Sequence, residues 1–145
     1  LATIITPNLP EAMCLLGREE DVTEEEFPEV ARELWKLLGR RNAWVYLKGG
    51  HLEGESAYDL LFNNVVSVPF TAPRVPTKNT HGTGCTLSSA IASNLAKGYS
   101  LSESVARAKE YISGALSAML DLGKGAGPMQ HNFDLRGEFA RENTK

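Results

Sequence analysis

The sequence lacks the features that mark several large classes of protein. It contains no Walker A loop, the phosphate-binding motif of P-loop proteins. Its longest apolar runs are too short to cross a bilayer, so we expect no membrane partner. No segment concentrates Lys and Arg, and the formal net charge is −3, so we expect no nucleic-acid partner. The two cysteines, Cys14 and Cys85, fit neither a disulfide framework nor a CxxC metal site. Free thiols predict a reducing compartment, the cytoplasm.

What remains is an ordinary composition for a single folded domain. The 145 residues are 42% apolar and 23% charged, which is enough to build a core. The chain opens at Leu1 without a Met, and its first six residues already read as a buried strand. We therefore expect it to be part of a longer chain.

Strand and helix patterns alternate along the sequence, which predicts an α/β fold with a mainly parallel sheet flanked by helices. Apolar runs or apolar periodicity mark each element. Strands are expected at Leu1–Thr6, Ala43–Leu47, Tyr58–Phe62 and Val65–Phe70, and helices at about 9–16, 24–38, 83–96 and 100–120.

Local signals refine several of these boundaries. Gly17 is expected to end the first helix, and Gly98 lies past the end of the third. Capping boxes are expected at Thr23 with Glu26 for the second helix and at Ser100 with Glu103 for the fourth. Pro28 predicts that the regular helix begins a few residues after Glu24. Asn63-Asn64 is expected to form the turn of a β-hairpin, because Asn tolerates positive φ.

The most informative segment is Thr77–Leu87, which reads TKNTHGTGCTL. Its glycines stand at the start of a predicted helix, where free backbone amides and the helix dipole favour an oxyanion or phosphate. Glycine lets that backbone approach the ligand closely. The same pattern also fits a glycine-rich turn that binds nothing.

Two further sets of residues are candidates for chemistry. Cys85 lies in the first turn of the predicted helix, where a thiolate is stabilised and can accept a proton; a buried structural Cys is the alternative, which we assign to Cys14. Asn8, Glu11 and Lys48 each follow a predicted strand, at the edge where α/β sheets bind ligands. Asn8 and Glu11 also fit a simple capping pair, and Lys48 a solvated turn residue.

At this point the sequence resembles the hydroxymethylpyrimidine/phosphomethylpyrimidine kinases of thiamine biosynthesis, within the ribokinase-like superfamily. Cysteine in the central motif, where sugar kinases of that superfamily have Asp, favours the pyrimidine or pyridoxal branch. The resemblance extends to about residue 133. It rests on five segments: Thr6–Ala12, Lys48–His51, Thr77–Ser88, Ala108–Tyr111 and Gly127–His131.

The resemblance implies a ribokinase-like fold and transfer of the ATP γ-phosphate to 4-amino-5-hydroxymethyl-2-methylpyrimidine and then to its monophosphate. It implies that Cys85 is the base or positions the hydroxyl. The amides of Gly82, Thr83 and Gly84 would form the anion hole for the transferring group. Phosphoryl transfer needs such positioning and charge stabilisation more than covalent chemistry.

The resemblance also assigns the nucleotide and its metal. Lys48 and Thr80 would face the phosphates of ATP, and Lys109 would lie near the nucleotide. Asn8 and Glu11 match the family's NxxE pattern, which serves Mg²⁺ through water. ATP and Mg²⁺ are therefore the implied cofactors.

Members of this family are nearly twice as long as this chain. The resemblance thus implies that residues 1–133 are the C-terminal half of the kinase domain, followed by a polar tail at 134–145. The other half would supply most of the pyrimidine pocket. That half, or self-association of this chain, would also cover the sheet surface that the missing strands leave exposed. The full-length form is expected to be a homo-oligomer. A pyridoxal kinase and a catalytically silent nucleotide-binding module are the alternative functions.

Overall fold

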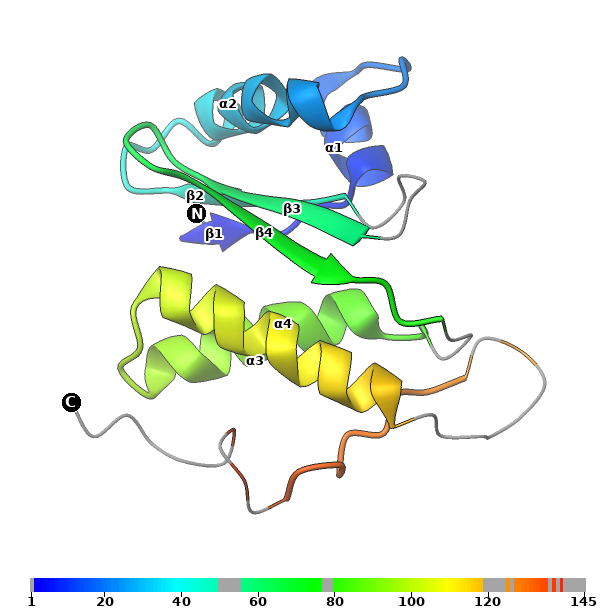
Figure 1. The fold of residues 1–145 in the computed structure, drawn as a ribbon. Coiled ribbons are helices and arrows are strands. Elements are labelled where there is room, and N and C mark those ends of the chain that lie inside the picture. Colours follow the sequence, from blue (N-terminus) through cyan, green and yellow to red (C-terminus); the bar gives the residue numbers. More distant parts are fainter. Residues whose placement is uncertain are drawn as a thin grey trace. The chain divides into compact units, whose positions relative to one another are not determined.

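The computed structural model describes residues 2–49, 56–76, 80–118, 125, 127–135, 137 and 139. The chain divides into two compact units, Leu1–Arg74 and Val75–Lys145. The first contains a sheet with two helices, and the second contains a pair of helices with the segment that follows them (Figure 1).

The described part of the sheet has four strands in the order β1-β2-β3-β4. β1 pairs with β2 in parallel, whereas β2 with β3 and β3 with β4 are antiparallel. Only seven residues join β2 to β3, and a parallel crossover needs a dozen or more. The α/β class is as expected, and this part of the sheet is mixed. The strands are β1 (Ile4–Ile5), β2 (Trp44–Lys48), β3 (Ser56–Phe62) and β4 (Ser67–Pro73).

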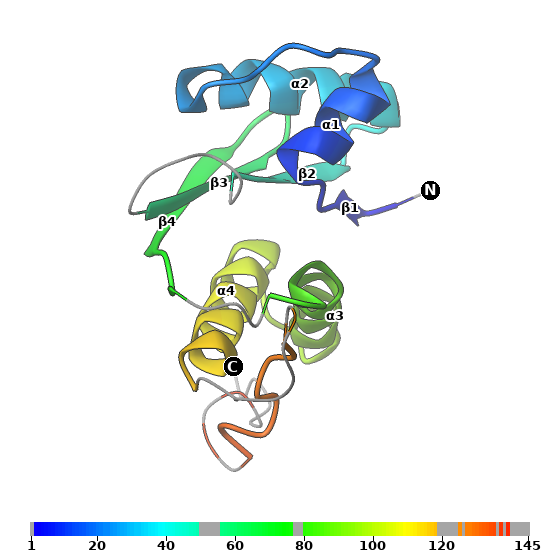
Figure 2. The same cartoon turned by 90° about the vertical axis from the view of Figure 1, so that its right-hand side faces the viewer.

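Helices α1 (Leu9–Leu16) and α2 (Phe27–Leu38) both cover the same face of the sheet (Figures 1 and 2). The buried side chains of α2 recur at helical spacing and pack against alternate residues of β2 and β3, which share one face of the sheet. This packing forms the core of the first unit. Its buried members on α2 and the two strands are Phe27, Val30, Ala31, Leu34, Val45, Leu47, Leu60 and Phe62.

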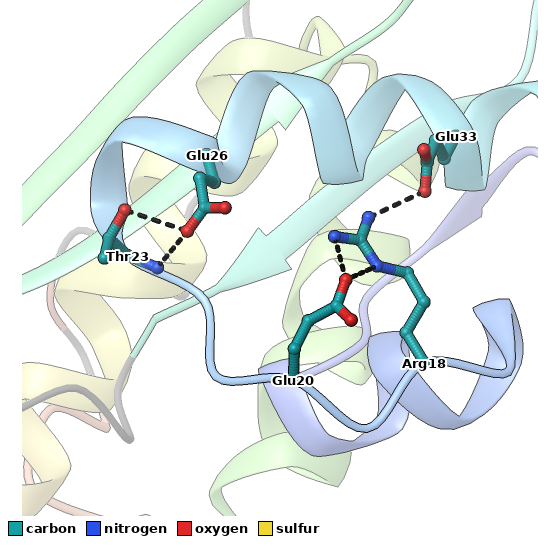
Figure 3. Close-up of polar contacts among 5 residues, drawn as sticks. All are labelled: Arg18, Glu20, Thr23, Glu26 and Glu33. Carbon is teal, nitrogen blue, oxygen red and sulfur yellow. Dashed lines mark hydrogen bonds and ion pairs between the residues drawn. The ribbon is translucent and has the colours of Figure 1, made fainter.

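The entry to α2 confirms the capping box. The Thr23 amide donates to Glu26 Oε2 at 2.9 Å, and the Thr23 hydroxyl reaches the same oxygen at 3.0 Å (Figure 3). The box opens a 3₁₀ turn at Glu24–Glu26, and the regular helix begins at Phe27 with proline in its first turn. This matches the later start that Pro28 predicts, because proline fits the first turn of a helix.

The loop between α1 and α2 is tied to α2 by an arginine. Arg18 contacts Glu20 and also reaches Glu33 on α2, with Nη1 at 2.9 Å from Glu33 Oε2 (Figure 3). The hydrogen bond to Glu20, followed by the one to Glu33, raises the pKa of Arg18. Ion pairs near solvent add little stability, but the contact from Arg18 to Glu33 connects the loop to α2.

Two expectations about the first 16 residues are wrong. The paired strand is limited to Ile4–Ile5, and both side chains are only half-buried. Cys14 is exposed and not a buried structural residue. The inward face of α1 is formed by Leu9, Ala12 and Met13. Cys14 follows one position later and points away from that face.

The hairpin between β3 and β4 is confirmed, but its turn is longer than two residues. The Asn63 amide donates to the Val66 carbonyl at 2.9 Å, and Asn63 Oδ1 accepts from the amides of Val65 and Val66. The asparagine therefore acts through its side chain as a local cap of the loop. Val65 lies in the turn, 86% exposed, and β4 starts only at Ser67.

Gly49, directly after β2, stands in a crowded position. A Cβ built there would overlap the Tyr58 carbonyl oxygen and lie 2.8 Å from Phe27 Cζ. Both contacts belong to the core of the first unit, so neither can move cheaply. Glycine is required here by space rather than by φ.

The second unit is built on a helical hairpin. α3 (Thr83–Ala96) and α4 (Leu101–Ser117) are joined by a short turn in which Gly98 has φ of 86°. Ser100 and Glu103 form the expected capping box at the start of α4. Arg107 on α4 donates to Asn94 on α3 at 2.8 Å. α4 ends at Ser117 with Ala118 as its C-cap, and the remainder of the expected extension to residue 120 lies outside the described residues.

The described helices include none that is both long and apolar enough to cross a membrane. Of the expected polar tail at 134–145, only residues 134, 135, 137 and 139 are described.

The capping box at Thr23 predicts a pH-dependent contribution to stability. Hydrogen bonds from the Thr23 amide and then its hydroxyl lower the pKa of Glu26 in the folded state. The stabilisation is therefore present at neutral pH and is lost as the pH falls through the folded pKa. We expect Thr23→Ala to raise the pKa of Glu26 toward its ordinary value, measured by NMR titration of the carboxyl carbon, and Thr23→Ser to leave it low. An equal pKa in all three proteins would contradict this.

The crowding at Gly49 predicts that Gly49→Ala destabilises the fold by about 1–3 kcal/mol, the usual range for overpacking a core. The measurement is the free energy of unfolding in urea. The control is Gly125→Ala, since a Cβ built at Gly125 meets nothing within 4 Å. Equal stability of the two variants would show that the Gly49 site can relax.

Candidate functional site

The glycine-rich turn is placed at the start of α3, as the sequence predicts. Gly82 is the N-cap residue with φ of 80°, in the left-handed region that favours glycine. The first bond of the helix runs from the Thr86 amide to the Gly82 carbonyl at 2.9 Å. Thr83 folds back on the preceding turn, with its hydroxyl 3.1 Å and its amide 3.4 Å from the Thr80 carbonyl oxygen. Residues 77–79 of the motif lie outside the described residues.

The electrostatics of this turn favour an anion. The amides in the first turn of α3 have no partner four residues earlier within the helix, and the helix dipole adds positive potential there. No acidic side chain occupies that turn. Gly82 brings no side chain, so the backbone itself is accessible to a ligand.

A segment near the C-terminus supports the entry to this turn. The His81 amide donates to the Gly127 carbonyl at 3.4 Å, and His81 forms a parallel bridge with Pro128. Met129 is 2% exposed, and the Gln130 amide donates to the Ala115 carbonyl near the end of α4 at 3.2 Å. The segment therefore links the residue before the turn to the end of the helical hairpin.

Cys85 lies in the first turn of α3 and is exposed. It lines an open pocket of about 480 Å³ along α3, whose lining also includes aromatic and basic side chains. Two of these are fixed: Lys97 Nζ donates to the Phe139 carbonyl at 2.9 Å, and Tyr111 Oη donates to the His131 carbonyl at 2.9 Å. The thiol thus has open space beside it in which a reacting group could approach.

Asn8, Glu11 and Lys48 come together in the first unit. Lys48 is the last residue of β2, its amide donates to the Pro7 carbonyl at 2.9 Å, and it forms a parallel bridge with Asn8. Parallel pairing of β1 with β2 places these carboxyl ends side by side. Asn8 and Glu11 also form a capping box, with Glu11 Oε2 2.7 Å from the Asn8 amide. The capping box is present, and it is compatible with the predicted role of Asn8 and Glu11 in binding a ligand.

Sequence reasoning missed Asp59 on β3, which is 8% exposed. Its Oδ1 accepts from the Gly49 amide at 3.0 Å, and its Oδ2 accepts from the Tyr46 hydroxyl at 2.8 Å. Burial, and then the negative charge of Asp59, raise the pKa of Tyr46 far above its ordinary value, so the phenol remains a donor. The available signal was a single acid within the apolar run of residues 57–62.

The expected site residues therefore form two groups. Asn8, Glu11 and Lys48 belong to the first unit, and Thr80, the Gly82–Gly84 turn, Cys85 and Lys109 to the second. Lys109 lies in the middle of α4 and is half-buried. Gly50 and His51 lie outside the described residues.

A divalent metal has a limited set of donors among the described residues. They contain no cluster of three or more His, Cys, Asp or Glu side chains. Glu11 is an exposed carboxylate at the edge where the strands end. A hydrated Mg²⁺ needs only one or two carboxylates beside substrate phosphates, so this donor set fits Mg²⁺ better than Zn²⁺.

Comparison with known proteins relates these features to a family. Residues 1–130 match the family described as Phosphomethylpyrimidine kinase. The chain is 49% identical over 131 residues to the thiamine biosynthesis bifunctional protein ThiED of Geobacter sulfurreducens, covering 90% of this chain and 26% of that protein. It is 44% identical to the hydroxymethylpyrimidine/phosphomethylpyrimidine kinase of Escherichia coli, covering 89% of this chain and 48% of the relative.

A solved structure shows the same fold. An ADP complex of Bacillus subtilis pyridoxal kinase superposes with a TM-score of 0.80 at 36% identity, covering 90% of this chain and 50% of that one. This chain spans about half the length of that kinase and of the E. coli relative. The fold is ribokinase-like, and the family match covers both groups of site residues. This chain belongs to the phosphomethylpyrimidine kinase family.

Proposed function

We propose that this chain carries the nucleotide and phosphate side of an ATP-dependent kinase that phosphorylates 4-amino-5-hydroxymethyl-2-methylpyrimidine and then its monophosphate. The observation that carries the proposal is the family match over residues 1–130, which includes the Gly82–Gly84 turn at the start of α3. Relatives at 44% and 45% identity bear the name of that kinase, and the relative at 49% identity belongs to thiamine biosynthesis.

In this proposal the start of α3 handles the transferring phosphoryl group. The amides of Gly82, Thr83 and Gly84 stabilise the charge that develops on the equatorial oxygens. The long Thr83–Thr80 bond is the one that such an oxygen would replace. Cys85, one residue further, accepts the proton of the substrate hydroxyl or holds that hydroxyl in line. Its exposed position beside a pocket supports this role.

The nucleotide phosphates are assigned to the cationic and polar residues. Lys48, at the end of β2, acts as a point charge on a phosphate, Thr80 also faces the phosphates, and Lys109 lies near the nucleotide. Asn8 and Glu11 would hold a hydrated Mg²⁺, which neutralises phosphate charge when bound. Capping leaves Glu11 oriented by the Asn8 amide, so the carboxylate is already ordered.

The alternative substrate is pyridoxal. Solved pyridoxal kinases share the fold at 30–36% identity, and one holds AMP-PCP together with pyridoxal. The relatives named for the pyrimidine reaction are more similar in sequence, at 40–46% identity. Since both groups bind a ring that carries a hydroxymethyl group, the higher identity favours the pyrimidine.

We also propose that most of the pyrimidine pocket lies outside these 145 residues. The chain covers 48–49% of the kinases named for this reaction. The remaining half of such a kinase, or a second copy of the chain, would complete the acceptor site.

Cys85 provides the first test. In the complete protein that contains this chain, Cys85→Ala should lower kcat for the pyrimidine alcohol by about 100-fold or more, the range for loss of a general base. The assay is ATP-dependent formation of the monophosphate. Cys14→Ala is the matched control, because Cys14 is also an exposed thiol on a helix but lies in the other unit. An unchanged kcat in the Cys85 variant would remove Cys85 from the mechanism.

The anion site at α3 is tested without turnover. Titration with inorganic phosphate, followed by amide chemical shifts, should move the amides of residues 82–85 in a saturable manner. The start of α4 is an internal control, because its capping box fills that turn with the Glu103 carboxylate. Equal shifts at both helix starts would indicate non-specific ion binding, and no shift at residues 82–85 would contradict the anion hole.

A further inference from the structure

Asp59 is a buried carboxylate that the proposed chemistry does not use. It lies within β3 among apolar residues and is 8% exposed. Burying an ionised carboxylate is costly unless hydrogen bonds compensate it. A buried carboxylate beside the strand end that is proposed to bind phosphate is therefore a candidate for a specific role.

Its two oxygens have different partners. Oδ1 accepts from the backbone amide of Gly49 at 3.0 Å, and Oδ2 accepts from the Tyr46 hydroxyl at 2.8 Å. Tyr46 also meets the Phe70 ring edge-on at 6.0 Å, so the phenol is itself held by β4. The carboxylate is thus oriented from both sides, and the bond to Gly49 is charge-assisted and stronger than a neutral one.

The register brings this carboxylate opposite Lys48. Lys48 pairs with Asp59 across β2 and β3, so both side chains belong to the same face of the sheet. On the other side of β2, the Lys48 amide is bonded to Pro7 on the β1 side. The strand end is therefore held by the backbone on one side and by Asp59 on the other.

Gly49 makes this arrangement strict. Its Cα faces the Tyr58 carbonyl and the Phe27 ring with no room for a Cβ. Any side chain at this position would disturb that packing. The hydrogen bond to Asp59 holds the Gly49 amide, and Lys48 is the residue immediately before it, at the end of β2.

We propose that Asp59 is a positioning residue that, by holding the Gly49 amide, directs Lys48 toward the phosphate groups of a nucleotide. The inference rests on the proposed function, in which Lys48 contacts those phosphates. Asp59 itself does not touch the nucleotide. Its effect is on the affinity for ATP and passes through Lys48.

The test is a double-mutant cycle in the complete protein that contains this chain, with KM for ATP, KM for the pyrimidine alcohol and kcat measured separately. Lys48→Met and Asp59→Ala should each raise KM for ATP about tenfold, as for loss of one charged hydrogen bond. The double variant should resemble Lys48→Met alone. KM for the alcohol should stay within about twofold in all of them, since a positioning role acts on one substrate only.

Two conservative variants guard against a folding defect. Asp59→Asn keeps an acceptor for the Gly49 amide and should raise KM for ATP only about threefold, because a neutral bond is about half as strong. Tyr46→Phe removes the other hydrogen bond of Asp59 and should change KM less than Asp59→Asn does. Thermal unfolding identifies any variant that does not fold. If Asp59→Ala does not fold, Asp59→Asn and Tyr46→Phe are compared in its place.

The outcomes separate the inference from the proposed function. An unchanged KM for ATP in Lys48→Met would refute the role of Lys48 and the inference with it. If KM for ATP rises in Lys48→Met but is unchanged in Asp59→Ala, only the role of Asp59 is overturned. Equal increases in both KM values, additive effects in the double variant, or a larger effect of Tyr46→Phe than of Asp59→Asn would each show a general structural role and contradict positioning.

Discussion

The first unit depends on the pairing of β2 with its two neighbours. On one side β2 pairs in parallel with β1, and on the other it pairs antiparallel with β3. The apolar face of β2 contributes Val45 and Leu47 to the core under α2. The same strand ends at Lys48, so the hydrogen bonds that build the core also set the position of a candidate phosphate ligand.

The second unit contains a candidate site of a different kind. It is a helix start with no acidic side chain, capped by a glycine in the left-handed region. This positive end is made of backbone, so it requires no lysine or arginine and no charged loop. The segment at Gly127 supports the turn from 46 residues away, through its bond to His81. The family match over residues 1–130 includes the candidate residues of both units.

Much of this arrangement was predictable because its signals are local. Capping boxes at Thr23 and Ser100, the glycine ends of α1 and α3, and the helix that follows the GTG turn depend on neighbours within a few residues. Two assignments were nevertheless wrong. Cys14 was assigned to the wrong face of a short helix, and the turn after β3 was assigned two residues, although the Asn63 side chain organises four.

The sequence by itself determined the family and the candidate site residues, because the segment TKNTHGTGCTL, with its glycines and Cys85, is contiguous and distinctive. Only the tertiary structure decided how the strand ends are held. The bridge from Asn8 to Lys48 joins residues 40 positions apart, and the bond from Gly49 to Asp59 depends on the register of β2 with β3. Register is set by packing of the whole sheet against α2. The partners of Asp59, a single acid within an apolar strand, are therefore determined only when the chain has folded.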